Sequence, residues 1–342
     1  MADLTLSAHC HCTSTTITFD IPRAALPLPI TLCHCTYCRT SHGTLASFLS
    51  TLPEGITPKI TSTNLRTYVP RNGHLGVKVR KLFCGRCGCP VAEEEVESKR
   101  WRVVSAIFER ECEDENGAKV KVWEYKRHVA PGSVAMGGLF RLLGSVIDGV
   151  QLDVEDVVDP DAVPPEETDN TMRASCHCAG VSFTFARPND AARSDSIANC
   201  FISPTDPSKW VCGLDHCDDC RLVTGANVMP WSFTLIELIS PAVEREEMRV
   251  GSSRMYASSE GTKRTFCYEC GATVFFWRAA RLETVDVPVG LMRGVDALVT
   301  RWVAWWPELV HAEDGRRFDG GFVRALEERY KEFLEVCGAA EK

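Results

Sequence analysis

Apolar and polar residues alternate in two short stretches that lie far apart in the chain. The first covers residues 16–21 (Thr-Ile-Thr-Phe-Asp-Ile) and the second covers residues 181–185 (Val-Ser-Phe-Thr-Phe). Period-two alternation is typical of a β-strand with one buried face. Near the end of the chain, apolar residues recur instead at helical intervals: Phe322, Leu326, Tyr330, Phe333 and Leu334. The pattern predicts a mainly β protein that ends in an amphipathic helix, whose apolar face we expect to pack onto its own domain rather than onto a partner.

The strand-like stretches belong to an internal repeat that is marked by cysteines. Each copy begins with a Cys-x-Cys pair, continues with a Cys-x-x-Cys-Arg element followed by a glycine, and closes with Phe-Cys-x-x-Cys-Gly. These elements fall at residues 10–12, 35–39 and 83–88, and again at residues 176–178, 217–221 and 266–271. Matching elements in the same order indicate a tandem duplication. The second copy has about 16 extra residues before its middle element, which we place in a loop within residues 187–210.

An acidic, proline-rich run separates the two copies at residues 159–170. Such a composition cannot bury a core and is typical of a linker. With 342 residues, the chain is also longer than one compact core usually holds. We therefore predict a first domain at residues 1–158, the linker at 159–170 and a second domain at 171–342.

Composition and charge argue against several classes of protein. A formal net charge of −8 argues against a nucleic-acid surface, and we interpret Lys78, Arg80 and Lys81 as a solvated strand edge. The chain opens without the regions of a secretory signal. Its most apolar stretch, residues 134–150, contains an arginine, an aspartate and several glycines, which is too polar for a membrane span. We therefore expect a cytoplasmic protein with no nucleic-acid or membrane partner.

In a reducing compartment, the 18 cysteines are better explained as metal ligands than as disulfides. Zinc prefers four ligands in a tetrahedron, and closely spaced cysteines supply two of them from one turn. The opening Cys-x-Cys pair of each copy can therefore combine with the closing Cys-x-x-Cys pair into a closed structural zinc site. The two predicted sites are Cys10, Cys12, Cys84 and Cys87 in the first copy, and Cys176, Cys178, Cys267 and Cys270 in the second.

The middle element of the first copy predicts a different kind of zinc site. Cys33, Cys35 and Cys38 supply three thiolates within one short segment. Three protein ligands with one open position are typical of a catalytic zinc. The alternative is a closed site with a fourth ligand from this set: Cys89, Cys112, His34 or His42.

The second copy departs from this pattern, because Asp215 precedes Cys217 and Cys220 where the first copy has a third cysteine. A carboxylate is a harder ligand than a thiolate, and Cys212 lies close enough in sequence to replace it. Two interpretations stay open: the site binds zinc with altered chemistry, or it is a degenerate copy. We expect the catalysed reaction to take place in the first copy. The counter-argument is that an aspartate ligand would leave zinc more Lewis-acidic than a third thiolate, which would favour the second copy as the catalytic one.

The cysteine order, with Arg39 and Gly43 after the middle group and Phe83 and Gly88 around the last, resembles the glutathione-dependent formaldehyde-activating enzyme family. Centromere protein V belongs to the same family, and the resemblance covers both halves of the chain. It implies two tandem β-tent zinc domains, with structural zinc in the closed sites and catalytic zinc at the cysteines of the middle element. Asp215 breaks the family pattern.

The resemblance implies a zinc-dependent carbon–sulfur lyase that acts on a thiol adduct, such as a glutathione adduct, of an aldehyde or another electrophile. A non-catalytic zinc scaffold is one alternative, with Trp302, Trp305 and Trp306 as a docking patch or simply as core beneath the terminal helix. A glutathione-independent enzyme that modifies or detoxifies a metabolite is another. His34 and His42 lie near predicted ligands, but we assign neither as the general acid or base.

Overall fold

The computed structural model describes residues 3–114, 117–133, 138–162, 165–294, 296 and 298–337. Strands dominate the chain, and it ends in helix α5 (Ala312–Cys337), so the mainly β class with a C-terminal helix is confirmed. Part of the apolar stretch (134–137) and part of the expected linker (163–164) lie outside the described residues. No helix among the described residues is long and apolar enough to cross a membrane.

The first half, here residues 3–158, contains two main sheets. The smaller sheet has the order β1 (Leu4–His9), β2 (Thr15–Ile21) and β5 (Lys59–Ser62). The larger sheet has the order β15 (Asp153–Glu155), β12 (Trp123–Val129), β3 (Leu28–Cys33), β4 (Ser47–Thr51), β9 (Trp101–Val104), β8 (Pro90–Glu95), β7 (Val79–Cys84) and β6 (Leu65–Tyr68). Three shorter elements lie beside them: the hairpins β10 (Glu111–Glu113)–β11 (Lys119–Lys121) and β13 (Val146–Ile147)–β14 (Val150–Gln151), and helix α2 (Leu139–Leu143). Buried residues alternate along β2, as predicted.

The second half, here residues 171–337, repeats this plan. Its smaller sheet has the order β16 (Thr171–Ser175), β17 (Ser182–Ala186) and β20 (Ile239–Ser240). Its larger sheet has the order β21 (Ser253–Ser259), β22 (Thr262–Cys267), β23 (Thr273–Arg278), β24 (Thr284–Pro288), β19 (Met229–Leu235), β18 (Trp210–Asp215) and β25 (Val303–Trp305). The extra residues of this half contain the short helices α3 (Asp190–Ser194) and η5 (Ala198–Phe201), so this segment is not a plain loop.

A strand–helix–strand unit carries the middle cysteines in each half. Helix α1 (Thr36–His42) lies between β3 and β4, and α4 (Asp218–Thr224) lies between β18 and β19. Each helix starts at a cysteine whose Sγ accepts a backbone N–H three residues later, and each ends at a glycine. Gly43 and Gly225 have φ of 85° and 70°. Glycine adopts this left-handed conformation without a steric penalty, which explains why both copies have it at this place.

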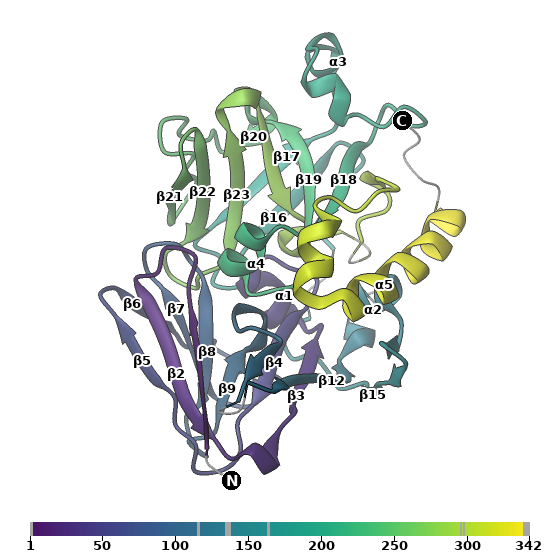
Figure 1. Cartoon of the computed structure of the whole chain (residues 1–342). Coiled ribbons are helices and arrows are strands. Elements are labelled where there is room, and N and C mark those ends of the chain that lie inside the picture. Colours follow the sequence, from purple (N-terminus) through teal and green to yellow (C-terminus); the bar gives the residue numbers. More distant parts are fainter. Residues whose placement is uncertain are drawn as a thin grey trace.

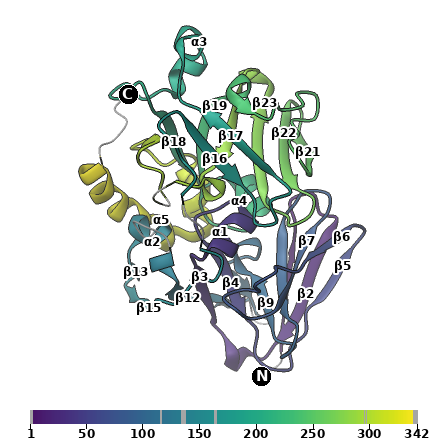
Figure 2. The same cartoon turned by 180° about the vertical axis from the view of Figure 1, so that it is seen from behind.

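The two halves lie one above the other, with α1 and α4 between them (Figures 1 and 2). Helix α1 contacts the turn η8 (Val289–Leu291) of the second half, and α4 contacts the turn η2 (Ser105–Ile107) of the first. One cluster of buried apolar side chains includes residues of both halves. The described strands of each sheet nevertheless come from one half only. The division at residues 158 and 171 stays a prediction, because the halves share this core.

Glycines of the closing motifs permit a close reciprocal contact between the halves. A Cβ on Gly88 would lie 2.6 Å from the Phe266 ring, and a Cβ on Gly271 would lie 2.8 Å from the Phe83 ring. Lys81 is also part of this interface, since its fully buried ammonium group donates to the carbonyl oxygens of Ser41 and Cys270. The expectation that Lys81 lies on a solvated strand edge is therefore wrong.

Helix α5 packs across both halves. Phe322 contacts Phe48 and Tyr125 of the first half, with ring centroids 5.7 Å away in each case. Further along, Tyr330 and Phe333 pack against Trp305, at centroid distances of 6.3 and 6.0 Å. Trp302 and Trp305 are buried, so neither forms an exposed docking patch; Trp305 belongs to the core beneath this helix, and Trp302 packs against Phe185.

The backbone leaves the helical conformation at Asp319 (φ −150°) within α5. Its carboxylate accepts hydrogen bonds from the Phe322 N–H and the Tyr125 hydroxyl and pairs with Arg110. The kink thus adapts the helix to the first half. The expected linker also packs onto this half, because the Asp159 carboxylate accepts the Thr36 N–H at 2.6 Å.

Candidate metal centres

Four clusters of potential metal ligands lie in the described residues, and each combines residues that the sequence analysis selected. In the first half, the turns after β1 and β7 bring together Cys10, Cys12, Cys84 and Cys87, all as free thiols. The Sγ atoms of Cys12 lie 3.5 Å from Cys10 and 3.6 Å from Cys84. Four thiolates around one zinc ion at Zn–S of about 2.3 Å would be about 3.8 Å apart. The spacing therefore fits a closed tetrahedral site.

The second half builds the corresponding cluster from the turns after β16 and β22. It contains Cys176, Cys178, Cys267 and Cys270. The Cys178 Sγ lies 3.5 Å from the Sγ atoms of Cys176 and Cys267. Each four-cysteine cluster joins the start of its half to a later hairpin, and this geometry suits a structural task.

The middle cluster of the first half has a fourth member that the sequence analysis did not find. His74, in the segment between β6 and β7, places its Nε2 3.3 Å from the Sγ atoms of both Cys33 and Cys38. Together with Cys35, these residues form a group of four donors, all buried. The expected open position is therefore filled, and by none of the residues considered for it.

A buried network holds the His74 ring in place. The Nδ1 atom lies 3.0 Å from a carboxylate oxygen of Glu93, whose other oxygen accepts the Tyr37 hydroxyl at 2.6 Å. Burial and Arg102 oppose a charge on the ring, but Glu93 and Cys33 outweigh them and raise the pKa of His74. A carboxylate on the second ring nitrogen is the usual support of a metal-binding histidine. The arrangement fits a closed Cys₃His site.

The four residues proposed as the fourth ligand lie elsewhere. Cys89 is buried beside the Pro90 carbonyl, and Cys112 lies on hairpin strand β10. His34 pairs with His128 at 2.9 Å, and His42 is buried at the end of α1. Burial lowers the pKa values of His34 and His42 well below their ordinary range.

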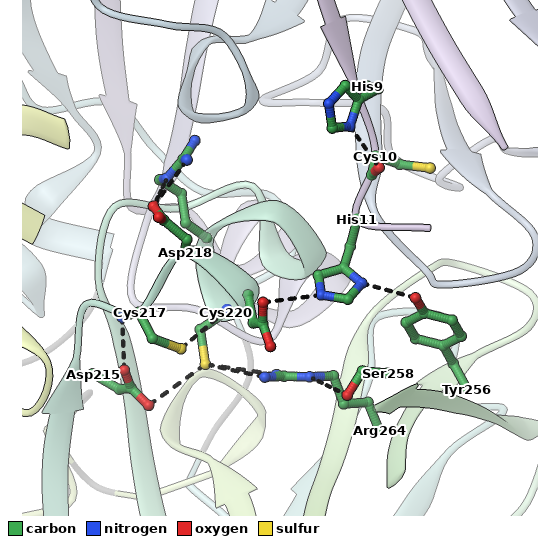
Figure 3. Close-up of polar contacts among 12 residues, drawn as sticks. His9, Cys10, His11, Asp215, Cys217, Asp218, Cys220, Tyr256, Ser258 and Arg264 are labelled. Atoms are coloured by element: carbon green, nitrogen blue, oxygen red, sulfur yellow. Dashed lines mark hydrogen bonds and ion pairs between the residues drawn. The ribbon is translucent and has the colours of Figure 1, made fainter. Parts of the chain in front are cut away.

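The middle cluster of the second half is built by the end of β18 and the start of α4. One carboxylate oxygen of Asp215 lies 3.5 Å from the Cys220 Sγ, and the other accepts the Cys217 N–H at 2.8 Å (Figure 3). His311 supports Asp215 through Nδ1 at 3.1 Å. Burial opposes ionisation of Asp215, but His311 and the Cys217 N–H keep its pKa below the usual range. Cys212 does not join the group; it is buried on β18.

An arginine in direct contact with a cluster sulfur, and open space beside the cluster, distinguish this second cluster from the first. The guanidinium group of Arg264 lies 3.6 and 3.7 Å from the Cys220 Sγ through its two terminal nitrogens (Figure 3). Asp215, Cys217 and Arg264 line a cavity of about 470 Å³. The two middle clusters differ because the chain connects the corresponding strands differently in the two halves. In the first half, residues 69–78 connect β6 to β7 and carry His74, whereas only residues 260–261 connect β21 to β22.

A histidine of each opening Cys-x-Cys pair reaches into the other half. His11 contacts the Tyr256 hydroxyl at 2.8 Å (Figure 3). It also contacts Asp219 of α4 at 3.1 Å. This contact lowers the pKa of Asp219, while burial raises the pKa of Tyr256 to about 12. In the mirrored contact, His177 meets the Tyr68 hydroxyl at 2.6 Å and Asp161 at 3.1 Å. Each middle cluster is therefore flanked by a turn of the opposite half.

Comparison with protein families matches both halves of the chain. A model of the glutathione-dependent formaldehyde-activating enzyme family matches residues 5–126 and 202–307. The chain belongs to this family. The first matched segment contains all the cysteines of both first-half clusters, and the second contains Asp215, Cys217, Cys220, Cys267 and Cys270. No curated protein matches the chain.

In this family member, the spacing of cysteines was sufficient to group fourteen candidate ligands into four clusters, but not to find His74. That residue follows Cys38 at a distance that forms no motif. Only the return of the chain between β6 and β7 brings it to the cluster. Arg264 had a weak signal, because it occupies the place of Lys81 before the closing Phe-Cys-x-x-Cys-Gly motif.

Proposed function

We propose that the protein is a zinc-dependent carbon–sulfur lyase-type enzyme whose reaction takes place at Asp215, Cys217 and Cys220. One observation carries this proposal: two of these three donors, Asp215 and Cys217, border a cavity, whereas the first-half counterparts of all three are buried and joined by His74. Three protein ligands with an accessible position are the arrangement of catalytic zinc, and four buried ligands are that of structural zinc. The reaction is thus assigned to the second half, contrary to our expectation from the sequence.

The donor set suits zinc. At ordinary Zn–O and Zn–S distances, a carboxylate oxygen and a thiolate around one zinc ion are about 3.6 Å apart, and the Asp215–Cys220 distance is 3.5 Å. Bound zinc would supply Lewis acidity toward a substrate oxygen, or hold a substrate thiol as thiolate. Two thiolates, one carboxylate and a divalent ion leave one negative charge, which Arg264 beside Cys220 can balance.

The substrate class follows from family membership together with this site. We propose an adduct in which a thiol sulfur, such as that of glutathione, is bound to the carbon of an aldehyde or another electrophile. For an aldehyde adduct, the carbon–sulfur bond breaks, the hydroxyl oxygen becomes the carbonyl oxygen, and the hydroxyl proton ends on the sulfur. No further reactant is needed. Cysteines grouped as metal ligands are typical of a reducing compartment, and we place the protein in the cytoplasm.

Matched cysteine variants test this assignment. Cys220→Ser should remain folded and lose turnover of a formaldehyde–thiol adduct by more than the roughly 10- to 100-fold typical of residues that only support a metal ligand. Cys38→Ser should instead lose stability, because it disturbs a buried cluster. Cys200→Ser is the control, since Cys200 is exposed and outside all four clusters.

Elemental analysis under reducing conditions should find at least two tightly bound zinc ions per chain, at the four-cysteine clusters. Cys220→Ser should contain less zinc than the parent protein. If Cys220→Ser keeps full turnover while folded Cys38→Ser is inactive, the reaction belongs to the first half and the proposal is wrong.

A further inference from the structure

The cavity beside the second-half cluster has an aromatic wall. Phe201 and Phe233 stack with ring centroids 4.2 Å apart and planes at 16°, and Trp306 meets Phe233 edge-on at 5.6 Å. Trp231 and Phe276 continue the wall, with centroids 6.0 Å apart. Offset-stacked and edge-to-face arrangements are those in which aromatic rings attract one another. A wall of this kind therefore offers several faces and edges to a further ring.

Part of this wall comes from the segment that the second half has in addition to the shared plan. Phe201 ends the short helix η5, which lies in the extra residues that follow β17. By placing Phe201 on Phe233, these residues extend the aromatic surface at the cavity that also contains Asp215 and Cys217.

A largely buried ion pair lies against the wall. Arg281 binds both carboxylate oxygens of Asp286, at 2.6 and 3.1 Å. Its guanidinium carbon lies 5.3 Å from the ring centroid of Phe201 and 5.5 Å from that of Phe233. A cation within about 6 Å of a ring centroid is attracted to the ring, so Arg281 stabilises the stacked pair of Phe201 and Phe233.

The cavity has room for more than the sulfur and the electrophilic carbon of an adduct. It measures about 470 Å³. That volume is in the range of sites for larger organic ligands, roughly 300–1,000 Å³. The Nε1–H of Trp231 is buried and has no acceptor among the described residues, so a ligand oxygen could satisfy it after a small shift.

We propose that the substrate of this site carries an aromatic ring, which packs against Phe201, Phe233 and Trp306 while the sulfur end of the adduct faces Asp215 and Cys217. The inference rests on the proposed function for the site's chemistry, but the ring-binding surface is a property of the cavity itself. The ring can come from the thiol or from the aldehyde, and the two sources are distinguished by experiment.

Binding to zinc-loaded, full-length protein tests the proposal without turnover. Titrations followed by tryptophan fluorescence would use benzyl mercaptan and benzaldehyde, each beside its saturated analogue, cyclohexylmethanethiol or cyclohexanecarboxaldehyde. Ring–ring contacts are expected to favour the aromatic member of one pair by about two- to tenfold. Whichever pair shows this preference identifies the part of the adduct that carries the ring.

Variants of Phe201 distinguish ring stacking from contact with any apolar side chain of similar size. Phe201→Leu should abolish the preference for the aromatic member, and Phe201→Tyr should keep it. Phe140→Ala is the matched control, since Phe140 lies on α2 in the first half, away from the cavity. Equal binding of aromatic and saturated ligands, or an unchanged preference in Phe201→Leu, would overturn the proposal.

Turnover then distinguishes this inference from the proposed function. If the aromatic ligands bind as expected but no thiol adduct is cleaved, the lyase proposal fails and the ring-binding site stands. If a formaldehyde adduct is cleaved but the aromatic ligands show no preference, the lyase stands and the ring-binding site fails.

Discussion

Replacing His74 by alanine tests the structural role of the closed first-half cluster. The change removes the donor that lies 3.3 Å from Cys33 and Cys38. It also removes the partner of the Glu93 carboxylate, a group with 1% of its side chain exposed. The remaining partners of Glu93 are the Tyr37 hydroxyl at 2.6 Å and the more distant Arg102 at 3.6 Å.

The size of the expected loss in unfolding free energy follows from the burial of these groups. Removing a hydrogen-bond partner of a buried charged group costs about 1–3 kcal/mol or more, because Glu93 then stays out of water with only Tyr37 and the more distant Arg102 as partners. Loss of a zinc ligand adds to this, since binding energy at a structural site is part of the folding energy. We therefore expect His74→Ala to lower the free energy of unfolding by at least about 3 kcal/mol, which can unfold a marginally stable protein.

Urea titration at pH 7 under reducing conditions, followed by tryptophan fluorescence, would measure this loss together with the zinc content. His311→Ala is the matched control. His311 also lies near a cluster, but 54% of its side chain is exposed, so its pairing with Asp215 should contribute less than about 1 kcal/mol. His74→Cys should recover much of the stability and the zinc, because it restores a ligand.

Unchanged stability and zinc content in His74→Ala, combined with loss of turnover, would refute the reasoning. The first-half cluster would then be an open catalytic site, as the cysteine spacing alone suggested. If His74→Cys is as unstable as His74→Ala, the ring supports the fold by packing rather than as a ligand.

Two further predictions concern the contact between halves and the cavity. Gly271→Ala should lower the free energy of unfolding by about 2–4 kcal/mol, because its φ of 80° disfavours alanine and the new Cβ would lie 2.8 Å from the Phe83 ring. Gly55→Ala is the control, since Gly55 has a φ of 84° but no atom within 4 Å of the new Cβ. In the same urea titration it should show only the backbone cost of about 1–2 kcal/mol. Burial raises the pKa of Asp286 to about 6 despite Arg281, so this carboxylate becomes neutral as the pH falls below 6 and leaves the arginine charge uncompensated. Calorimetry should then show benzoate binding more tightly at pH 5 than at pH 7.5, and benzamide binding equally at both; the same trend in Asp286→Asn would show that another group is responsible.

The repeat, the strand-rich class and the terminal helix could be predicted from the sequence because each depends on local spacing, and the grouping of cysteines followed from the order of the repeated pairs. A Cys-x-Cys pair places two thiols in one turn whatever the rest of the chain does. Gly43 and Gly225 end their helices for an equally local reason, the left-handed backbone at those positions. The same holds for the alternation along β2 and the apolar face of α5.

Tertiary structure decided which middle cluster is open. Cys33 and Cys38 present the same pattern whether a fourth ligand is near or not, and His74 reaches them only because the chain makes a long excursion between β6 and β7. In the second half a tight turn between β21 and β22 replaces this excursion, so no histidine is brought to the cluster from there. Phe201, which is distant in sequence from that turn, adds to the wall of a cavity beside the cluster. Both outcomes depend on contacts between distant segments. Spacing along the chain carries no record of such contacts, because they are determined by how the sheets and loops pack.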